Sequence, residues 1–533
     1  MTGSPLDIDG LDLEDLKQLI FRLLEENVVL REDNVALREE VARLKGLKGR
    51  PRIKPSGMDK ATQANTTRAG VKTGRRGAKR LVIDTEQVIA ASVPPRSRFK
   101  GYEEYVVQEL ILRPHVTRFR RERWRTPDGA TVVAPLPPGI VGHFGPELRR
   151  YVLALYHRGQ VTMPRLVAQL NDLGIDISKR QVVRLLNAGK EDFLGEAGAV
   201  LRAGLETASW ITVDDTGARH RGSNGVCTQI GNDHFAWFAT TSSKSRLNFL
   251  ALLRADHEDY VINDAAVAYM HGHNLTAPVV ALLAGHQTRR FADEAAWRAH
   301  LDGLAITALK VQPDPVSIAT EGALWGSVTD HGLLADAVVI SDDAGQFNVG
   351  YHALCWVHAE RLIHKLTGFT ENQRAALERI RARVWWFYAD LKTYCRDPTP
   401  AGKRALSRRF DRIFATRTEY ATLDRLLDRL RANKDELLVA LERPDIPLHT
   451  NASENDIRCQ SLPPTRSGVT RRKISAGTRS DAGRNCRDGF LGLMKTCDKL
   501  DVGFWNYLGS RLNVPEAPTV PPLPQLIRQR AAA

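Results

Sequence analysis

Three acidic residues that lie far apart in the chain have local sequences suited to a metal-binding carboxylate. Asp214 follows the apolar run 210–213, Asp342 follows the run 337–341, and Glu454 lies at the start of a helical pattern. A short β-branched run that ends in Asp indicates a buried strand that delivers its carboxylate to the edge of a sheet. Two such strands and one helix can bring three carboxylates to a pair of divalent cations, which supports in-line attack on a phosphodiester. An Asp that only caps a turn is the alternative at each strand end.

Each strand acid has an acidic neighbour, so its position is ambiguous by one residue. Asp215 and Asp343 are the alternatives to Asp214 and Asp342. Successive side chains of a strand point to opposite faces of the sheet, so only one acid of each pair can face the metals. We favour Asp214 and Asp342. Hard carboxylate oxygens suit two Mg²⁺ ions about 4 Å apart, with Mn²⁺ as the expected substitute.

The composition is that of a large globular protein with a polyanionic partner. The 533 residues are enough for several domains, 43% of them are hydrophobic, and the mean hydropathy is −0.31. A formal charge of +14 favours nucleic acid, without separating DNA from RNA. No segment approaches the roughly 20 apolar residues of a membrane span, and residues 1–10 lack the order of a signal peptide. We therefore expect a cytoplasmic, nucleoid-associated protein with no membrane partner.

The segment 1–46 has the heptad pattern of a leucine zipper. Leucine recurs at every seventh position, and the other seam position holds aliphatic residues or Asn. This pattern is typical of a parallel two-stranded coiled coil, in which the Asn fixes the register. We expect homodimerisation through Leu16, Leu23, Asn27, Leu30, Asn34, Leu37 and Leu44. An amphipathic helix packed on its own domain is the alternative.

Two basic regions follow the zipper. Residues 47–100 lack hydrophobic periodicity and are interrupted by Gly and Pro, which predicts a flexible arm that follows DNA phosphates, with a solvated linker as the alternative. Residues 101–145 alternate and are rich in Arg around Phe119 and Trp124. They predict a small β-rich unit that either contacts nucleic acid or exposes a solvated face. The expected phosphate contacts of the arm are Arg50, Arg52, Lys54, Arg75 and Arg76.

A helical region, 146–205, precedes the first acid. Within it the helix 164–170, a turn with Gly174 and a second helix capped by Ser178 predict a helix-turn-helix-like DNA-binding region. An ordinary helical bundle is the alternative. The expected DNA contacts are the basic outward positions of the second helix, Lys179, Arg180 and Arg184.

Residues 206–361 and 442–512 are expected to form an α/β catalytic core. The runs 227–231 and 235–241 alternate like the partners of a hairpin that follows Asp214. The order strand acid, hairpin, strand acid, helix acid is that of ribonuclease-H-like nucleotidyl transferases, so a core of ribonuclease-H-like type is expected.

The remaining segments surround this core. Residues 250–334 carry a mixed pattern that predicts no particular element, and residues 362–441 predict a large helical insertion. The Pro-rich tail, 513–533, is expected to be poorly ordered.

Four motifs resemble the DDE transposases of bacterial insertion sequences, in the family typified by insertion sequence sixty-six. Residues 214–216 read Asp-Asp-Thr where that family has Asp-Glu-Thr, and residues 342–345 place the second acid before an Ala-Gly pair. Residues 355–361 match Cys-Trp-x-His-x-x-Arg, and residues 451–458 match the Asn-x-x-Glu motif of the third acid. The zipper and the basic stretch after it also resemble this family, so the resemblance covers most of the chain.

The chain departs from that family at three points. Asp215 replaces the usual Glu, and Asn455 stands where Arg is usual. No Cys precedes Cys227, so the Cys-rich zinc-finger module common after the zipper is absent. The six cysteines show no CxxC spacing and are expected to be reduced thiols. Cys355 and His358 lack the second pair that a zinc site needs.

The resemblance implies a Mg²⁺-dependent DDE transposase, in which Asp214, Asp342 and Glu454 hold the metals. Its partners would be double-stranded DNA (the element's terminal inverted repeats and the target), a second copy of the chain, and accessory proteins of the same element. His358 and Arg361 would contact a nucleotide near the active site; core packing of Cys355 and Trp356 is the alternative reading of that motif. The segment after Glu454 is basic and Gly-rich, which by itself suits contact with phosphates, with a solvated basic surface as the alternative. The expected contacts are Arg458, Arg471, Arg472, Lys473 and Arg479.

Two rival functions stay open. A non-catalytic dimeric DNA-binding regulator derived from a transposase would keep the motifs without the chemistry. A nuclease of the same fold would cut DNA without joining it.

Overall fold

The computed structural model describes residues 83–137, 140, 142–457 and 477–532. The chain divides into two compact units, 1–106 and 107–533. In the first unit, the described residues 83–106 contain no helix or strand. The predicted coiled coil lies outside the described residues, and so do most of the basic arm and the segment after Glu454, which include Arg50, Arg52, Lys54, Arg75, Arg76, Arg458, Arg471, Arg472 and Lys473.

A five-stranded mixed sheet forms the centre of the second unit. Its strand order is β5-β4-β3-β8-β9. The strands are β3 (Trp210–His220), β4 (Ser223–Gly231), β5 (Ala236–Thr241), β8 (Val338–Ser341) and β9 (Tyr351–Leu354). β3, β4 and β5 pair antiparallel, whereas β3, β8 and β9 pair parallel. The mixed α/β class and the predicted hairpin, now β4–β5, are confirmed.

The first predicted strand was expected to end at Asp214, and this expectation is wrong. β3 continues to His220, because β4 pairs with it along the whole length, as far as His220↔Ser223. β8 pairs with β3 only from Trp210 to Thr212. Asp214 therefore lies just past the point where the parallel neighbour leaves, with its backbone still held by β4.

Side chains of β8 alternate between two hydrophobic cores. Val339 belongs to the core that contains Ile211 and Val213 of β3. Val338 and Ile340 belong to a second core, built on the helices after β9. Since all four residues of β8 are buried, the strand is covered on both faces, as expected for a central strand with parallel neighbours. Near the acids, one face of the sheet therefore packs on the first core and the other face packs on the second.

Short helices precede the sheet, after a hairpin that is the only strand pairing within the described part of 101–145. Ser178 caps α5 in a capping box: its hydroxyl accepts from Gln181 N, and its own N–H donates to Gln181 Oε1 at 2.8 Å. α4 packs on α5, as a helix-turn-helix requires. The elements are β1 (Arg123–Arg125), β2 (Thr131–Val133), α3 (Pro146–Leu153), the π-helical turn η2 (Ala154–Arg158), α4 (Met163–Asp172), α5 (Lys179–Asn187) and α6 (Glu191–Thr207).

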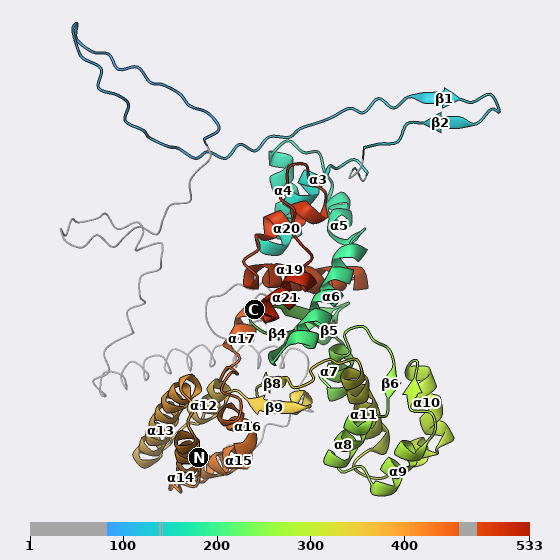
Figure 1. The fold of residues 1–533 in the computed structure, drawn as a ribbon, viewed down its shortest axis with the longest axis vertical. Coiled ribbons are helices and arrows are strands. Elements are labelled where there is room, and N and C mark those ends of the chain that lie inside the picture. The colour runs from blue at the N-terminus through green and yellow to red at the C-terminus, as the bar shows by residue number, and fades with distance from the viewer. Residues whose placement is uncertain (1–82, 138–139, 141, 458–476, 533) are drawn as a thin grey trace, which may run out of the picture. The chain divides into compact units, whose positions relative to one another are not determined.

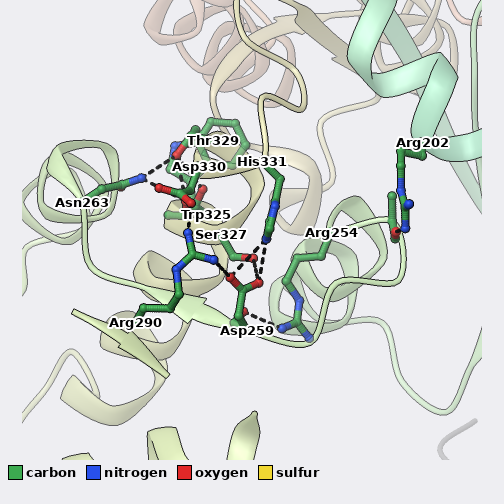
Figure 2. Close-up of polar contacts among 12 residues, drawn as sticks. Arg202, Arg254, Asp259, Asn263, Arg290, Trp325, Ser327, Thr329, Asp330 and His331 are labelled. Atoms are coloured by element: carbon green, nitrogen blue, oxygen red, sulfur yellow. Dashed lines mark hydrogen bonds and ion pairs between the residues drawn. The ribbon is translucent and has the colours of Figure 1, made fainter. Parts of the chain in front are cut away.

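The stretch between β5 and β8, for which the sequence predicted no element, is mostly helical. It contains α7 (Arg246–Leu253), β6 (Tyr260–Val261), α8 (Asp264–Gly272), α9 (Ala277–Gly285), β7 (Arg290–Phe291), α10 (Glu294–Gly303), η3 (Ile306–Ala308) and α11 (Pro315–Asp330). Figure 2 shows the polar network that ties β6, β7 and α11 together. Asp259 accepts hydrogen bonds from Ser327 Oγ at 2.7 Å, His331 Nε2 at 3.0 Å and Arg290 at 2.5 Å. Burial would raise the pKa of Asp259, but these bonds outweigh burial and hold it below its ordinary value.

Helices also fill the stretch between β9 and the third acid. They are α12 (Trp356–His364), α13 (Glu371–Arg396), α14 (Pro400–Phe414), α15 (Ala421–Ala432), α16 (Lys434–Leu437) and η5 (Val439–Leu441), and Figure 1 shows α12 to α16 gathered in one group. Trp356 packs in their core against Phe387, Phe410 and Phe414. The domain boundaries placed around this block from the sequence stay predictions.

After α17 (Asn451–Ile457) the chain returns to the sheet through α19 (Asp481–Lys499), α20 (Phe504–Arg511) and α21 (Leu523–Ala531). The expectation of a poorly ordered tail is wrong. Leu523 and Ile527 are fully buried where α21 packs on α6, and the carboxylate of Glu196 accepts from Leu523 N at 2.9 Å. Pro524, the second residue of α21, is compatible with a helix because the first-turn residues need no backbone donor for the helical hydrogen bonds. None of the helices in the described part of the chain is long and apolar enough to span a bilayer.

Candidate active site

Asp214 and Asp342 lie side by side at the same edge of the sheet. In the parallel pairing of β3 and β8, Thr212 is opposite Ile340. Asp214 lies two residues after Thr212, and Asp342 lies two residues after Ile340. The register therefore brings the two carboxylates to neighbouring positions, although 127 residues (215–341) lie between them in the sequence.

The pleat of β3 decides which acid faces α17. Thr212 Oγ1 lies 2.5 Å from Ser453 Oγ of α17, and both residues are buried. Since Asp214 is two residues from Thr212, it is on that same face. Asp215 is on the opposite face, where it accepts hydrogen bonds from Lys244 at 2.9 Å and Gln346 at 2.8 Å.

The second neighbour acid is also engaged elsewhere. Asp343 accepts hydrogen bonds from Arg429 and, at 3.4 Å, from Asn433, both at the end of α15. The Asp342 carboxylate instead accepts only from the nearby backbone, from Ala344 N at 3.2 Å, among the hydrogen bonds of the described residues. The geometry thus favours Asp214 and Asp342 over their neighbours.

Charge at Asp214 is electrostatically unfavourable. Burial, with a smaller contribution from the charge of Asp342, raises the pKa of Asp214 to about 6, although the Asp215 N–H and the charge of His358 oppose the increase. Two carboxylates that share a poorly solvated site repel each other, and a cation between them would relieve that repulsion. The pair therefore has the chemistry of a cation-binding site.

Helix α17 is fixed to strand β3 by one contact and to helix α19 by another. Ser453 bonds to Thr212 of β3, and Asp456 forms ion pairs with Lys499 at 3.0 Å and Lys495 at 3.6 Å on α19. These contacts hold Glu454 over the same face of β3 that carries Asp214. Sequence reasoning missed all of them, because each joins segments whose approach only the fold defines.

The Cys-Trp-x-His-x-x-Arg motif divides into a packing half and a polar half. Cys355 Sγ accepts from Thr450 N at 3.3 Å, and Trp356 Nε1 donates to Leu437 O at 2.8 Å. Both side chains are buried, so the packing alternative holds for these two residues. Because Thr450 immediately precedes α17, this half of the motif positions the helix that carries the third acid.

The polar half of the motif contacts Glu454 directly. Arg361 donates to both carboxylate oxygens, at 2.5 Å and 3.1 Å, and His358 Nε2 lies 3.3 Å from Oε1. Burial opposes charge on both His358 and Cys355, but the hydrogen bond between them outweighs burial, raising the pKa of His358 and lowering that of Cys355. The Arg361 guanidinium therefore neutralises Glu454, with His358 beside the pair.

The three acids are near one another without forming a ready metal site. Among the described residues, no three His, Cys, Asp or Glu side chains are close enough to hold a metal ion. Glu454 is directed at Arg361, while the charges of His358 and Arg361 also act on Asp214. The predicted convergence on metals stays a prediction, and it requires Glu454 to exchange its partner.

The other described residues predicted to contact DNA are exposed. Lys179, Arg180 and Arg184 lie on the outer side of α5, and Arg479 precedes α19.

Comparison with known proteins identifies the family. Residues 335–483, which include Asp342 and Glu454 but not Asp214, match the family model described as Transposase IS66 family. The uncharacterised protein y4jO of Sinorhizobium fredii (strain NBRC 101917 / NGR234) is 52% identical over 332 residues, which are 62% of this chain and 100% of that protein. The chain belongs to the IS66 transposase family. This membership supports a transposase-related function, and enzymes of the DDE class generally use divalent metals.

Proposed function

We propose that the protein is a DDE transposase that binds the terminal inverted repeats of its insertion sequence, cleaves a DNA strand and joins it to a target. The observation that carries this proposal is the alignment of Asp214 with Asp342 across parallel strands, beneath the helix that bears Glu454. The strand order and the positions of the three acids are compatible with a ribonuclease-H-like core.

The three carboxylates fit a site for two Mg²⁺ ions, or for Mn²⁺ in their place. All donors are hard oxygens, and the raised pKa of Asp214 indicates a pair of acids that a cation would stabilise. When bound, the metals would supply the activation of the attacking oxygen and stabilisation of the leaving oxygen in phosphodiester chemistry. Asp214, Asp342 and Glu454 would hold them.

Other residues of the chain would bind and orient DNA. The exposed cations of α5 (Lys179, Arg180 and Arg184), together with Arg479 and the basic segments around residues 50–76 and 458–473, would contact phosphates. His358 and Arg361 would bind the strand at the acids. The coiled coil would pair two copies, so that both ends of the element are processed together.

Purified full-length protein tests the proposal with labelled DNA taken from the two flanks of its own gene, where inverted repeats are expected. With Mg²⁺, cleavage at the repeat tip and joining of the new 3′ end to a target plasmid are expected. Binding without any cleavage would favour the non-catalytic regulator. Cleavage without joining, even of pre-cut ends, would favour the nuclease.

A further inference from the structure

A small pocket opens beside Asp342, between α12 and the end of α15. Its volume is about 170 Å³. Four basic side chains line it, from α12, the residue that follows α12, and α15: His358, Arg361, Lys365 and Arg429. Asp342 and Asp343 line it as well, so the pocket adjoins the acids of the proposed active site.

The cations of this pocket differ in their partners. Arg361 is bonded to Glu454, and Arg429 donates to Asp343. Lys365 follows α12 at its C-terminal end, is exposed, and forms no ion pair with another described residue. An anion that enters the pocket would therefore meet Lys365 first, with the Arg361 guanidinium one helical turn away.

Resting on the proposed function, we propose that this pocket receives a phosphodiester of the DNA strand, and that Arg361 then exchanges Glu454 for the phosphate. The planar guanidinium fork fits a phosphate as well as it fits a carboxylate. Once released, Glu454 completes the carboxylate set of Asp214 and Asp342. Arg361 is thus a positioning residue that makes binding of the catalytic metal depend on the presence of DNA.

Burial gives this exchange its direction. The Arg361 side chain is 40% exposed and the Glu454 side chain 13% exposed. An arginine at the surface is accessible to a DNA backbone, whereas a largely buried carboxylate that loses its arginine has only His358 as a cationic group nearby and gains from a metal cation in its place. DNA and metal therefore favour each other's binding, and the coupling is reciprocal.

Calorimetric titration of Mn²⁺ into the full-length protein measures this coupling, with and without a short duplex of arbitrary sequence, after subtraction of Mn²⁺ binding by the duplex alone. For the wild type, the duplex is expected to strengthen Mn²⁺ binding about tenfold. Arg361→Ala is expected to bind Mn²⁺ about tenfold more tightly without DNA and to gain nothing when the duplex is added. The reverse pattern, weaker Mn²⁺ binding by Arg361→Ala with an unchanged melting temperature, would overturn the exchange.

Three further variants make the result specific. Lys365→Ala should bind Mn²⁺ alone like the wild type but lose most of the gain from the duplex. Arg417→Ala removes an exposed arginine, paired with Asp428 in the same helical block, and should behave like the wild type in both arms. Glu454→Gln should weaken Mn²⁺ binding in both arms. If Glu454→Gln has no effect, the proposed function fails; if it weakens binding but Arg361→Ala does not strengthen it, only the exchange fails.

Discussion

At the scale of single residues, Asp214 shows how a site for chemistry opposes stability. Its carboxylate has to be charged to bind a cation, yet burial and the neighbouring Asp342 disfavour that charge. The pKa of about 6 lies above the value of roughly 3.9 expected in an unfolded chain. Stability from this group is therefore full below about pH 4 and is lost as the pH rises through 6.

Asp214→Asn should remove this titration. In metal-free buffer the variant and the wild type should be about equally stable near pH 4, and the variant should be more stable by about 3 kcal/mol at pH 7.5, because a shift of about two pKa units corresponds to that order of energy. Denaturant unfolding at a series of pH values, with a chelator present, measures the difference. A difference that does not change with pH would contradict the buried, charged site.

Sequence reasoning at this scale predicted a set of acids but not their partners. A β-branched run before Asp342 predicted where that carboxylate lies, because a strand end defines a position in a sheet. The bond between Arg361 and Glu454 joins residues 93 positions apart, with the helical block between them. A local sequence pattern does not report contacts between residues so far apart, so the bond between Glu454 and Arg361 could not be predicted.

At the scale of elements, one of the contacts that hold α17 is a buried pair of hydroxyl groups, Thr212 and Ser453. Thr212→Val keeps the shape of the side chain but leaves the Ser453 hydroxyl without this partner, which should cost about 1–3 kcal/mol of stability. Thr212→Ser, which keeps the hydroxyl group but loses the methyl group, is the matched control. Beyond the effect of that lost methyl group, its stability should remain within about 0.5 kcal/mol of the wild type. Thermal unfolding compares the three proteins. Equal stability of the Val variant and the wild type would show that the contact contributes nothing.

Asp259 likewise stabilises the segment between β5 and β8 through its hydrogen bonds. Asp259→Ala removes the acceptor for Ser327, His331 and Arg290 (Figure 2) and should cost about 2 kcal/mol at pH 7. Because its folded pKa is lowered, the contribution of the carboxylate is present above the unfolded pKa and is lost as the pH falls through the folded value. Unfolding measured at pH 7 and near pH 3 checks this. A loss as large at pH 3 as at pH 7 would contradict the ionic role.

Elements with a clear apolar stripe could be predicted, and others could not. The helical region 362–441 has one polar and one apolar side per helix, and helices do form there. The stretch 250–334 gave no prediction because β6 and β7 are only two residues long and α11 buries residues around much of its circumference, including Ile318, Ala323 and Val328. Periodicity distinguishes only elements that are long and exposed on one side.

At the scale of the whole molecule, the C-terminal helix α21 packs on α6 and is part of the fold. Proline content suggested a poorly ordered tail, but composition does not report what a segment packs against. Leu523→Ala should cost about 2–5 kcal/mol, since the side chain is fully buried against α6. Gln525→Ala, on the exposed side of α21, is the control and should change stability by less than about 0.5 kcal/mol. Thermal unfolding of the two variants decides whether α21 is part of the core; equal stability would mean that it is not.

The central claim is that three acids, brought together by strand register and one packed helix, perform the DNA chemistry. The most direct measurement is strand cleavage and joining by Asp214→Asn, Asp342→Asn and Glu454→Gln, beside the neighbour variant Asp343→Asn, using labelled ends and Mg²⁺. We predict that the first three lose both reactions by at least about 1,000-fold while still binding the ends, and that Asp343→Asn stays within about tenfold of the wild type. Full cleavage and joining by any of the first three would contradict the claim.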